Sequence, residues 1–135
     1  MNKKVSILIV IDSSAESLEL ARILTDALSG EDTKCIKAAE FSAEMILGAE
    51  LCVFGCSAPN PAEFEHLERL LKHINLTLRY AALFSPSNEA AIQYLNKIIM
   101  DCGIKSSAPP LLNSSPIAIK QWASDIINPF LSQSA

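Results

Sequence analysis

The sequence predicts an α/β fold, a three-layer sandwich in which helices cover both faces of a five-stranded parallel sheet of order 2-1-3-4-5. Segments that are apolar almost throughout, as in strands covered on both faces, alternate with segments of helical periodicity. This alternation has no linker, repeat or low-complexity tract within it. Strict alternation implies right-handed crossovers between parallel strands. The order 2-1-3-4-5 is the common one for five such strands.

The first half of the chain supplies three strands and two helices. Val5–Ile11 is rich in β-branched residues and almost continuously apolar, which predicts a buried first strand. The next segment has a helical stripe that ends at Gly30, a typical helix-ending residue. This stripe comprises Leu18, Ala21, Leu24 and Leu28. Lys34–Ala38 is the second strand, Ser42–Leu47 a short helix, and Leu51–Cys56 the strongly apolar third strand.

A cap followed by proline marks the start of the third helix. Asn60–Pro61 combines a helix-capping side chain with proline at the first helical position. The apolar face of this helix comprises Phe64, Leu67, Leu71 and Ile74. Arg79–Phe84 follows as the fourth strand, and Ser87 is the expected cap of a fourth helix that ends at Gly103.

The last two elements are an irregular strand and a helix. Ile104–Leu112 is rich in proline, so we expect it to hold only a short, irregular fifth strand. Ser115–Pro116 repeats the combination of cap and proline. The buried face of the last helix comprises Ile119, Trp122, Ala123, Ile126 and Phe130.

Composition limits the classes of protein to consider. With 135 residues, 50% of them hydrophobic and 19% charged, the chain is expected to form a single folded domain over residues 1–135. A net charge of −4 and the lack of a basic cluster argue against nucleic acid and anionic membranes as partners. The apolar start is too short to cross a bilayer and is interrupted by Asp12 and Glu16, so we expect a cytoplasmic protein.

Three polar turns follow the first, third and fourth predicted strands. Because ligands of open parallel sheets bind beyond the carboxyl ends of the strands, where the strand order reverses, these turns form the predicted binding site. The candidate binding residues are Asp12, Ser13, Ser14, Ala15, Glu16, Ser17, Ser57, Ala58, Pro59, Asn60, Ser85, Ser87 and Asn88.

Over nearly its whole length the chain resembles the flavodoxin family. The opening strand is followed by a hydroxyl-rich turn and a helix that begins Leu-Glu-Leu-Ala, and both Gly48–Pro59 and Trp122–Ala123 look like corresponding parts of that family. The resemblance implies a flavodoxin-like fold that binds FMN. It also implies transfer of electrons to a protein partner, so a redox-active chain would be an electron carrier rather than an enzyme that converts a substrate.

The first turn departs from the flavodoxin phosphate loop, which reads roughly Ser/Thr-x-Thr-Gly-x-Thr. Ser14 and Ser17 keep the hydroxyls, but Asp12 replaces a hydroxyl, Ala15 replaces the glycine and Glu16 adds a second acid. Alanine resists the close backbone approach and the positive φ that glycine allows. A carboxylate about 5 Å from the phosphate costs roughly 3 kcal/mol per charge pair, or on the order of a hundredfold in affinity.

The second and third turns also depart from the family. Flavodoxins usually hold the flavin ring between aromatic side chains of these turns, and Ser57–Asn60 and Ser85–Asn88 contain none. Tyr94 lies too far along the fourth predicted helix to replace them. We therefore expect FMN binding to be weak or lost. The alternative function is a flavin-free module that contacts a redox or signalling protein, or binds another small ligand.

The first turn has a purely structural interpretation as well. Ser13 followed by Glu16 matches a capping box, in which two side chains satisfy free amides at a helix start. A ligand-binding turn and a simple helix cap both remain open at this point. The chain has no Ser-His-Asp arrangement, catalytic pair of carboxylates or Walker loop, so the sequence leaves enzymatic activity undecided.

The four cysteines are predicted to be small buried hydrophobic residues. None is in Cys-x-x-Cys spacing, and no group of residues suggests a metal site. Cys52 and Cys56 should share one face of the third strand, because side chains alternate along a strand. Cys56 ends that strand beside the predicted site, so a reactive thiol is the alternative there.

Overall fold

The computed structural model describes residues 4–76, 79–100 and 102–133. Its strands are β1 (Ser6–Ile11), β2 (Asp32–Lys37), β3 (Leu51–Gly55), β4 (Tyr80–Ser85), β5 (Lys105–Ser106) and β6 (Leu111–Leu112). They form one sheet in the order β2-β1-β3-β4-β5, with β6 also paired to β4, and all pairings are parallel. The predicted fold class and strand order are therefore confirmed.

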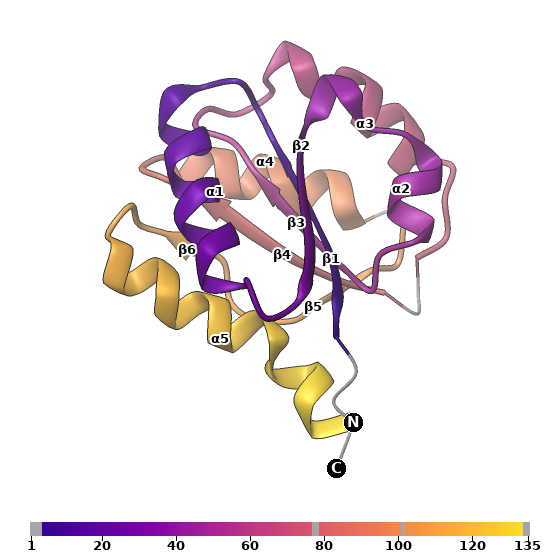
Figure 1. The fold of residues 1–135 in the computed structure, drawn as a ribbon. Helices are drawn as coiled ribbons and strands as arrows, with labels where there is room; N and C mark the ends of the chain where they lie inside the picture. The colour runs from indigo at the N-terminus through magenta and orange to yellow at the C-terminus, as the bar shows by residue number, and fades with distance from the viewer. Residues whose placement is uncertain (1–3, 77–78, 101, 134–135) are drawn as a thin grey trace.

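Helices cover both faces of this sheet (Figure 1). They are α1 (Ala15–Ala27), α2 (Ala43–Leu47), α3 (Glu65–Leu71), α4 (Glu89–Met100) and α5 (Pro116–Gln133), with short 3-10 helices η1 (Ala38–Glu40) and η2 (Ala62–Phe64). Helices α1 and α5 pack on one face, and α2, α3 and α4 pack on the other. None of the helices in the described residues is long and apolar enough to span a bilayer.

Each face of the sheet has its own hydrophobic cluster. In β1, Ile7, Ile9 and Ile11 pack toward α1 and α5, while Leu8 and Val10 pack toward α2, α3 and α4. This double burial explains why the strand is apolar at successive positions rather than at alternate ones. With both faces covered, the ends of the strands and the gaps between helices are left for binding.

The start and the end of α1 differ from the prediction. Leu18 is 41% exposed, and the buried stripe includes Leu20 together with Ala21 and Leu24. The helix ends at Ala27 with Leu28 as its C-cap, so Gly30 does not end it. The backbone N–H of Leu28 donates hydrogen bonds to Leu24 O and Thr25 O and closes the last turn without a left-handed residue, so no glycine is required there.

Two other residues that were predicted to cap helices, Asn60 and Ser87, do not do so. Pro61 precedes η2, and α3 begins only at Glu65, so Asn60 does not cap it. Asn60 instead has φ 51, a left-handed conformation that asparagine tolerates better than most residues. At α4, the side chain that accepts a helix amide is that of Asn88, from Ala90 N at 3.0 Å, rather than that of Ser87. Gly103 has φ 74, as expected of a glycine that follows a helix.

The predicted fifth strand is divided into two short pieces. β5 pairs with Tyr80 and Ala81 at the start of β4, and β6 pairs with Phe84 and Ser85 at its end. The segment between them contains Pro109, Pro110 and two further residues. Proline has no amide hydrogen to donate to a neighbouring strand, which accounts for the gap in the pairing.

Candidate functional site

The three predicted turns meet at the carboxyl edge of the sheet, the upper edge in Figure 1, where β1 ends. Strands β1, β3 and β4 are adjacent and parallel, so the residues that follow them lie at one edge. Hydrogen bonds join the first turn to the second through Asp12 and Ser57, and to the third through Glu16 and Ser87. The predicted gathering of these turns is thus present in the fold.

Asp12 links the first two turns. Its side chain is only 5% exposed. Oδ2 accepts hydrogen bonds from Ser57 N at 3.4 Å and Ser57 Oγ at 3.1 Å, and Oδ1 accepts one from Ser14 Oγ at 3.2 Å. A buried carboxylate requires such donors, because an unpartnered charge is costly to bury. Asp12 is therefore part of the structure of the edge and points into the site.

Glu63, a residue that the sequence did not single out, occupies the donors of Ser13. Ser13 N donates to Glu63 Oε2 at 2.8 Å, and Ser13 Oγ donates to Glu63 Oε1. Glu63 lies in η2, directly beyond the second turn. From the sequence it belongs to a run of charged residues expected on a solvated helix face, and no local pattern links it to a serine 50 residues earlier.

The start of α1 is capped differently from the predicted capping box. Ser14 is the N-cap, and its Oγ accepts a hydrogen bond from Ser17 N at 3.2 Å. Ser13, the predicted cap, instead donates its amide and its hydroxyl to Glu63. The Ser17 side chain is fully buried, and its hydroxyl makes no hydrogen bond among the described residues. Ser17 is therefore the hydroxyl of this turn whose hydrogen bond is not made within the described residues.

The second turn offers little beyond its backbone. Ala58, Pro59 and Asn60 are exposed and Ser57 is partly buried, and no aromatic side chain belongs to the turn. The aromatic residue considered from the sequence, Tyr94, lies in α4 with its ring centroid 6.2 Å from that of Phe64 in η2. It belongs to the packing between helices rather than to the edge of the sheet.

The third turn is used mainly for structure. Ser85 is fully buried, and its Oγ accepts a hydrogen bond from Asn88 N at 3.2 Å. Asn88 in turn caps α4 through Ala90 N. Ser87 is exposed and reaches Glu16 Oε2 at 3.4 Å, the longer end of the hydrogen-bonding range. Two of the three predicted residues in this turn therefore stabilise the start of the helix.

Cys56 follows β3 at this edge. It is fully buried, and burial, followed by the neighbouring Asp12 carboxylate, raises the pKa of its thiol to about 12. Because the thiolate is the nucleophile, these two features favour the buried hydrophobic residue over the reactive-thiol alternative. Cys52 and Cys102 are buried as predicted, while Cys35 is exposed. The described residues include no group of acids, histidines and cysteines that could hold a metal ion.

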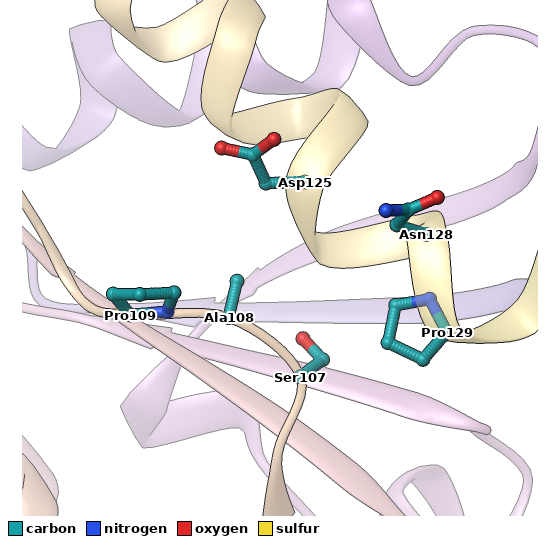
Figure 2. Close-up of a pocket in the computed structure, with 6 residues that line it drawn as sticks. All are labelled: Ser107, Ala108, Pro109, Asp125, Asn128 and Pro129. Atoms are coloured by element: carbon teal, nitrogen blue, oxygen red, sulfur yellow. The ribbon is translucent and has the colours of Figure 1, made fainter.

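Two of the hollows in the structure lie away from the first and third predicted turns. Figure 2 shows the first, of about 350 Å³, where the connection between β5 and β6 faces α5. Its walls are Ser107, Ala108, Pro109, Asp125, Asn128 and Pro129. Trp122 Nε1 donates to Pro109 O at 2.9 Å and ties this connection to the helix. The second hollow, of about 420 Å³, lies between α3 and α4, and Asn60 is the predicted site residue on its wall.

Comparisons with solved structures agree on one architecture. Flavodoxin 2 from Bacillus cereus superposes with a TM-score of 0.83 at 16% sequence identity, covering 93% of this chain and 100% of that one. A flavodoxin from Streptococcus pneumoniae TIGR4 gives 0.79 at 14% identity, with 93% and 99% covered. A flavodoxin from the domain Archaea gives 0.71 at 17% identity, with 91% and 96% covered.

No protein-family model matches the sequence, and no curated protein is recognisably similar to it. The likeness therefore concerns the arrangement of the backbone and not the identity of the site residues. It extends over 93% of this chain, whose strand order is the one described above. The chain has a flavodoxin-like fold.

Proposed function

We propose that this chain is a flavodoxin-like domain in which FMN binding is weak or lost and which serves as a flavin-free binding module. One observation carries the proposal. Two carboxylates of the chain itself, Asp12 and Glu63, accept the hydrogen bonds of the first turn and its neighbour. In a flavodoxin-like site the same turn would offer those donors to the phosphate of FMN.

The free-energy cost that these carboxylates impose on phosphate binding can be given to an order of magnitude. Removing Glu63 from Ser13 breaks hydrogen bonds to a charged acceptor, each of which contributes about 1.5–3 kcal/mol. If Glu63 and Asp12 stay in place, each carboxylate repels a nearby phosphate by roughly 3 kcal/mol at an effective dielectric constant of about 20. Either way, affinity falls on the order of a hundredfold for each carboxylate.

The flavin ring lacks its usual support as well. Ala58, Pro59 and Ser87 are exposed at the positions where stacking side chains would be expected, and none is aromatic. Aromatic pairs contribute about 0.5–1.5 kcal/mol beyond the area that they bury. A ring bound here would contact small side chains only, which supports the flavin-free interpretation.

A second candidate function, an FMN-dependent electron carrier, has support in two features. The fold is that of flavodoxins, and the buried Ser17 hydroxyl has no partner in the described part of the chain. In that case Ser17 would donate to the phosphate, and bound FMN would supply reversible one- and two-electron chemistry. The partner would then be a redox protein, whereas the flavin-free module would bind a signalling protein or a small ligand.

Titration of the purified protein with FMN separates the two functions. We expect a colourless protein that does not quench FMN fluorescence up to about 100 μM, which corresponds to less than about 6 kcal/mol of binding free energy. A protein that is yellow as purified, or that binds FMN at or below about 1 μM, would overturn the proposal.

Matched variants then test the reason for weak binding. Glu63→Gln removes the charge beside Ser13, and Asp12→Ser with Ala15→Gly restores a family-like turn. We expect each change to strengthen FMN binding by about tenfold or more. Glu65→Gln is the control, because Glu65 is exposed two residues away and pairs with Arg69 instead of the first turn. Equal affinities in Glu63→Gln and Glu65→Gln would exclude charge at the turn as the cause.

A further inference from the structure

The hollow between α3 and α4 is bordered by polar side chains that form no ion pair or hydrogen bond of good geometry within the described residues. Its volume of about 420 Å³ lies within the range of about 300–1,000 Å³ that is usual for small-molecule sites. Two helices and the turn after β3 supply its walls. The wall residues are Asn60, Glu68, Lys72, Tyr94, Lys97 and Ile98.

Tyr94 provides a buried donor at this hollow. Its ring packs against Phe64, and its hydroxyl oxygen is buried without a hydrogen bond to any described residue. Burial, followed by the Glu68 carboxylate, raises the pKa of this phenol, so the hydroxyl stays protonated; Glu68 lies close enough to compete with a ligand as the acceptor of this hydroxyl. A buried hydroxyl without a partner is uncommon in folded proteins and is satisfied when a ligand supplies an acceptor.

Two exposed lysines border the same hollow, one from the end of α3 and one from α4. Lys72 follows the last residue of α3, and Lys97 lies in α4. Within the described residues neither lysine forms an ion pair, in contrast to Arg22 and Arg69 on exposed helix surfaces. Glu68 offsets one of the two positive charges. The described wall therefore has a net charge of about +1, although the chain as a whole is acidic.

We propose that this hollow binds a small organic monoanion, a carboxylate joined to an apolar group. The carboxylate would lie between Lys72 and Lys97 and accept a hydrogen bond from the Tyr94 hydroxyl, and the apolar part would contact Ile98. The net charge favours a monoanion over a dianion, because a second negative charge would face Glu68. This site is separate from the first turn, and the inference holds whether or not the turns bind FMN.

Benzoate and benzamide are matched probes for this site, because they share a ring and differ in charge. Binding is followed by chemical-shift changes in two-dimensional NMR spectra of the full chain. We expect benzoate to bind with a Kd of about 1 mM and to shift signals of α3 and α4, with benzamide at least about tenfold weaker. Equal binding of the two probes, or no benzoate binding up to about 10 mM, would overturn the proposal.

Variants test the assignment of the residues. Lys72→Gln with Lys97→Gln should weaken benzoate binding by about tenfold or more, and Tyr94→Phe by about fivefold. Lys120→Gln is the control, since it removes the same charge from an exposed position of α5 on the opposite face of the sheet. A similar loss in the control and in the double variant would show attraction by general surface charge, and would contradict a built site.

Discussion

The carboxyl edge of the sheet and the hollow between α3 and α4 are both polar, but they differ in where their hydrogen bonds go. At the edge, the donors of Ser13, Ser14 and Ser57 all reach carboxylates of the same chain. At the hollow, the Tyr94 hydroxyl makes no hydrogen bond of good geometry among the described residues, although the Glu68 carboxylate lies near it. Topology therefore predicts where a ligand site can lie, and the partners of the side chains decide whether a ligand is needed there.

The difference follows from the elements that build each region. Strands β1 and β3 are directly paired, so the residues just after them, Asp12 and Ser57, are held within hydrogen-bonding distance. The hollow lies between two helices, whose separation is set by the side chains at their contact. Lysines with long, flexible stems border that gap and keep their charged ends near solvent.

The largest predicted effect comes from two buried thiols, that of Cys52 in β3 and that of Cys56 directly after this strand. Burial is the main cause that raises the pKa of Cys52 and of Cys56 from 9.0 to about 12. The unfolded chain therefore loses these protons first as the pH rises above 9, so stability is complete below that pH and falls toward pH 12. The loss approaches about 1.4 kcal/mol per pH unit and thiol.

Urea unfolding at pH 8 and pH 10 measures this effect. We expect wild-type protein to lose about 3 kcal/mol of unfolding free energy between these values. The control is the double variant Cys52→Ala with Cys56→Ala, which keeps every other titrating group. It should be less stable at pH 8 because two small cavities form, but should lose much less on going to pH 10. Equal losses in the two proteins would show that the thiols are not responsible.

Removal of the Asp12 side chain tests whether hydrogen bonds within the chain stabilise the carboxyl edge of the sheet. Asp12→Ala leaves Ser57 N, Ser57 Oγ and Ser14 Oγ without their acceptor. We expect a loss of about 2 kcal/mol in the free energy of unfolding at pH 7, measured in urea. Glu16→Ala is the matched control, because this exposed carboxylate makes a single long contact with Ser87. A cost no larger than that of the control would mean that the link between the turns contributes no stability.

Most of the fold could be predicted because its signals are local or topological. The apolar runs located β1, β3 and β4, and strict alternation predicted the strand order and the edge where the turns meet. The split of the last strand followed from Pro109 and Pro110, although the proline-rich sequence indicated only an irregular strand. Leu18 was misplaced because the helix positions Leu20 and Ala21 against the sheet.

The side-chain partners of the site could not be predicted in the same way. Ser13 and Ser14 are both ordinary helix-capping residues. In the structure Ser14 caps α1, whereas Ser13 donates to Glu63, a distant residue that no local pattern links to it. The hollow between α3 and α4 depends on the spacing of two helices, which no periodicity in the sequence encodes. From the sequence, Tyr94 on the wall of this hollow was considered only as a residue that could stack on a flavin ring. In the structure its ring packs against Phe64 instead.

The smallest predicted effect, that of Tyr94→Phe, best distinguishes the hollow from the carboxyl edge. This substitution should raise the stability of the protein and lower its affinity for benzoate. Tyr94→Phe removes a buried hydroxyl that has no partner and keeps the ring against Phe64. Since burying an unsatisfied polar group is unfavourable, we expect the variant to gain about 1 kcal/mol in thermal or urea unfolding while losing benzoate affinity.

At the carboxyl edge the equivalent change has the opposite sign. Ser57→Ala removes a hydroxyl that donates to Asp12 at 3.1 Å, and we expect it to lose about 1 kcal/mol of stability. If Tyr94→Phe were as destabilising as Ser57→Ala, the Tyr94 hydroxyl would be satisfied within the chain. The hollow would then resemble the edge of the sheet, in which the chain supplies its own acceptors and no ligand is required.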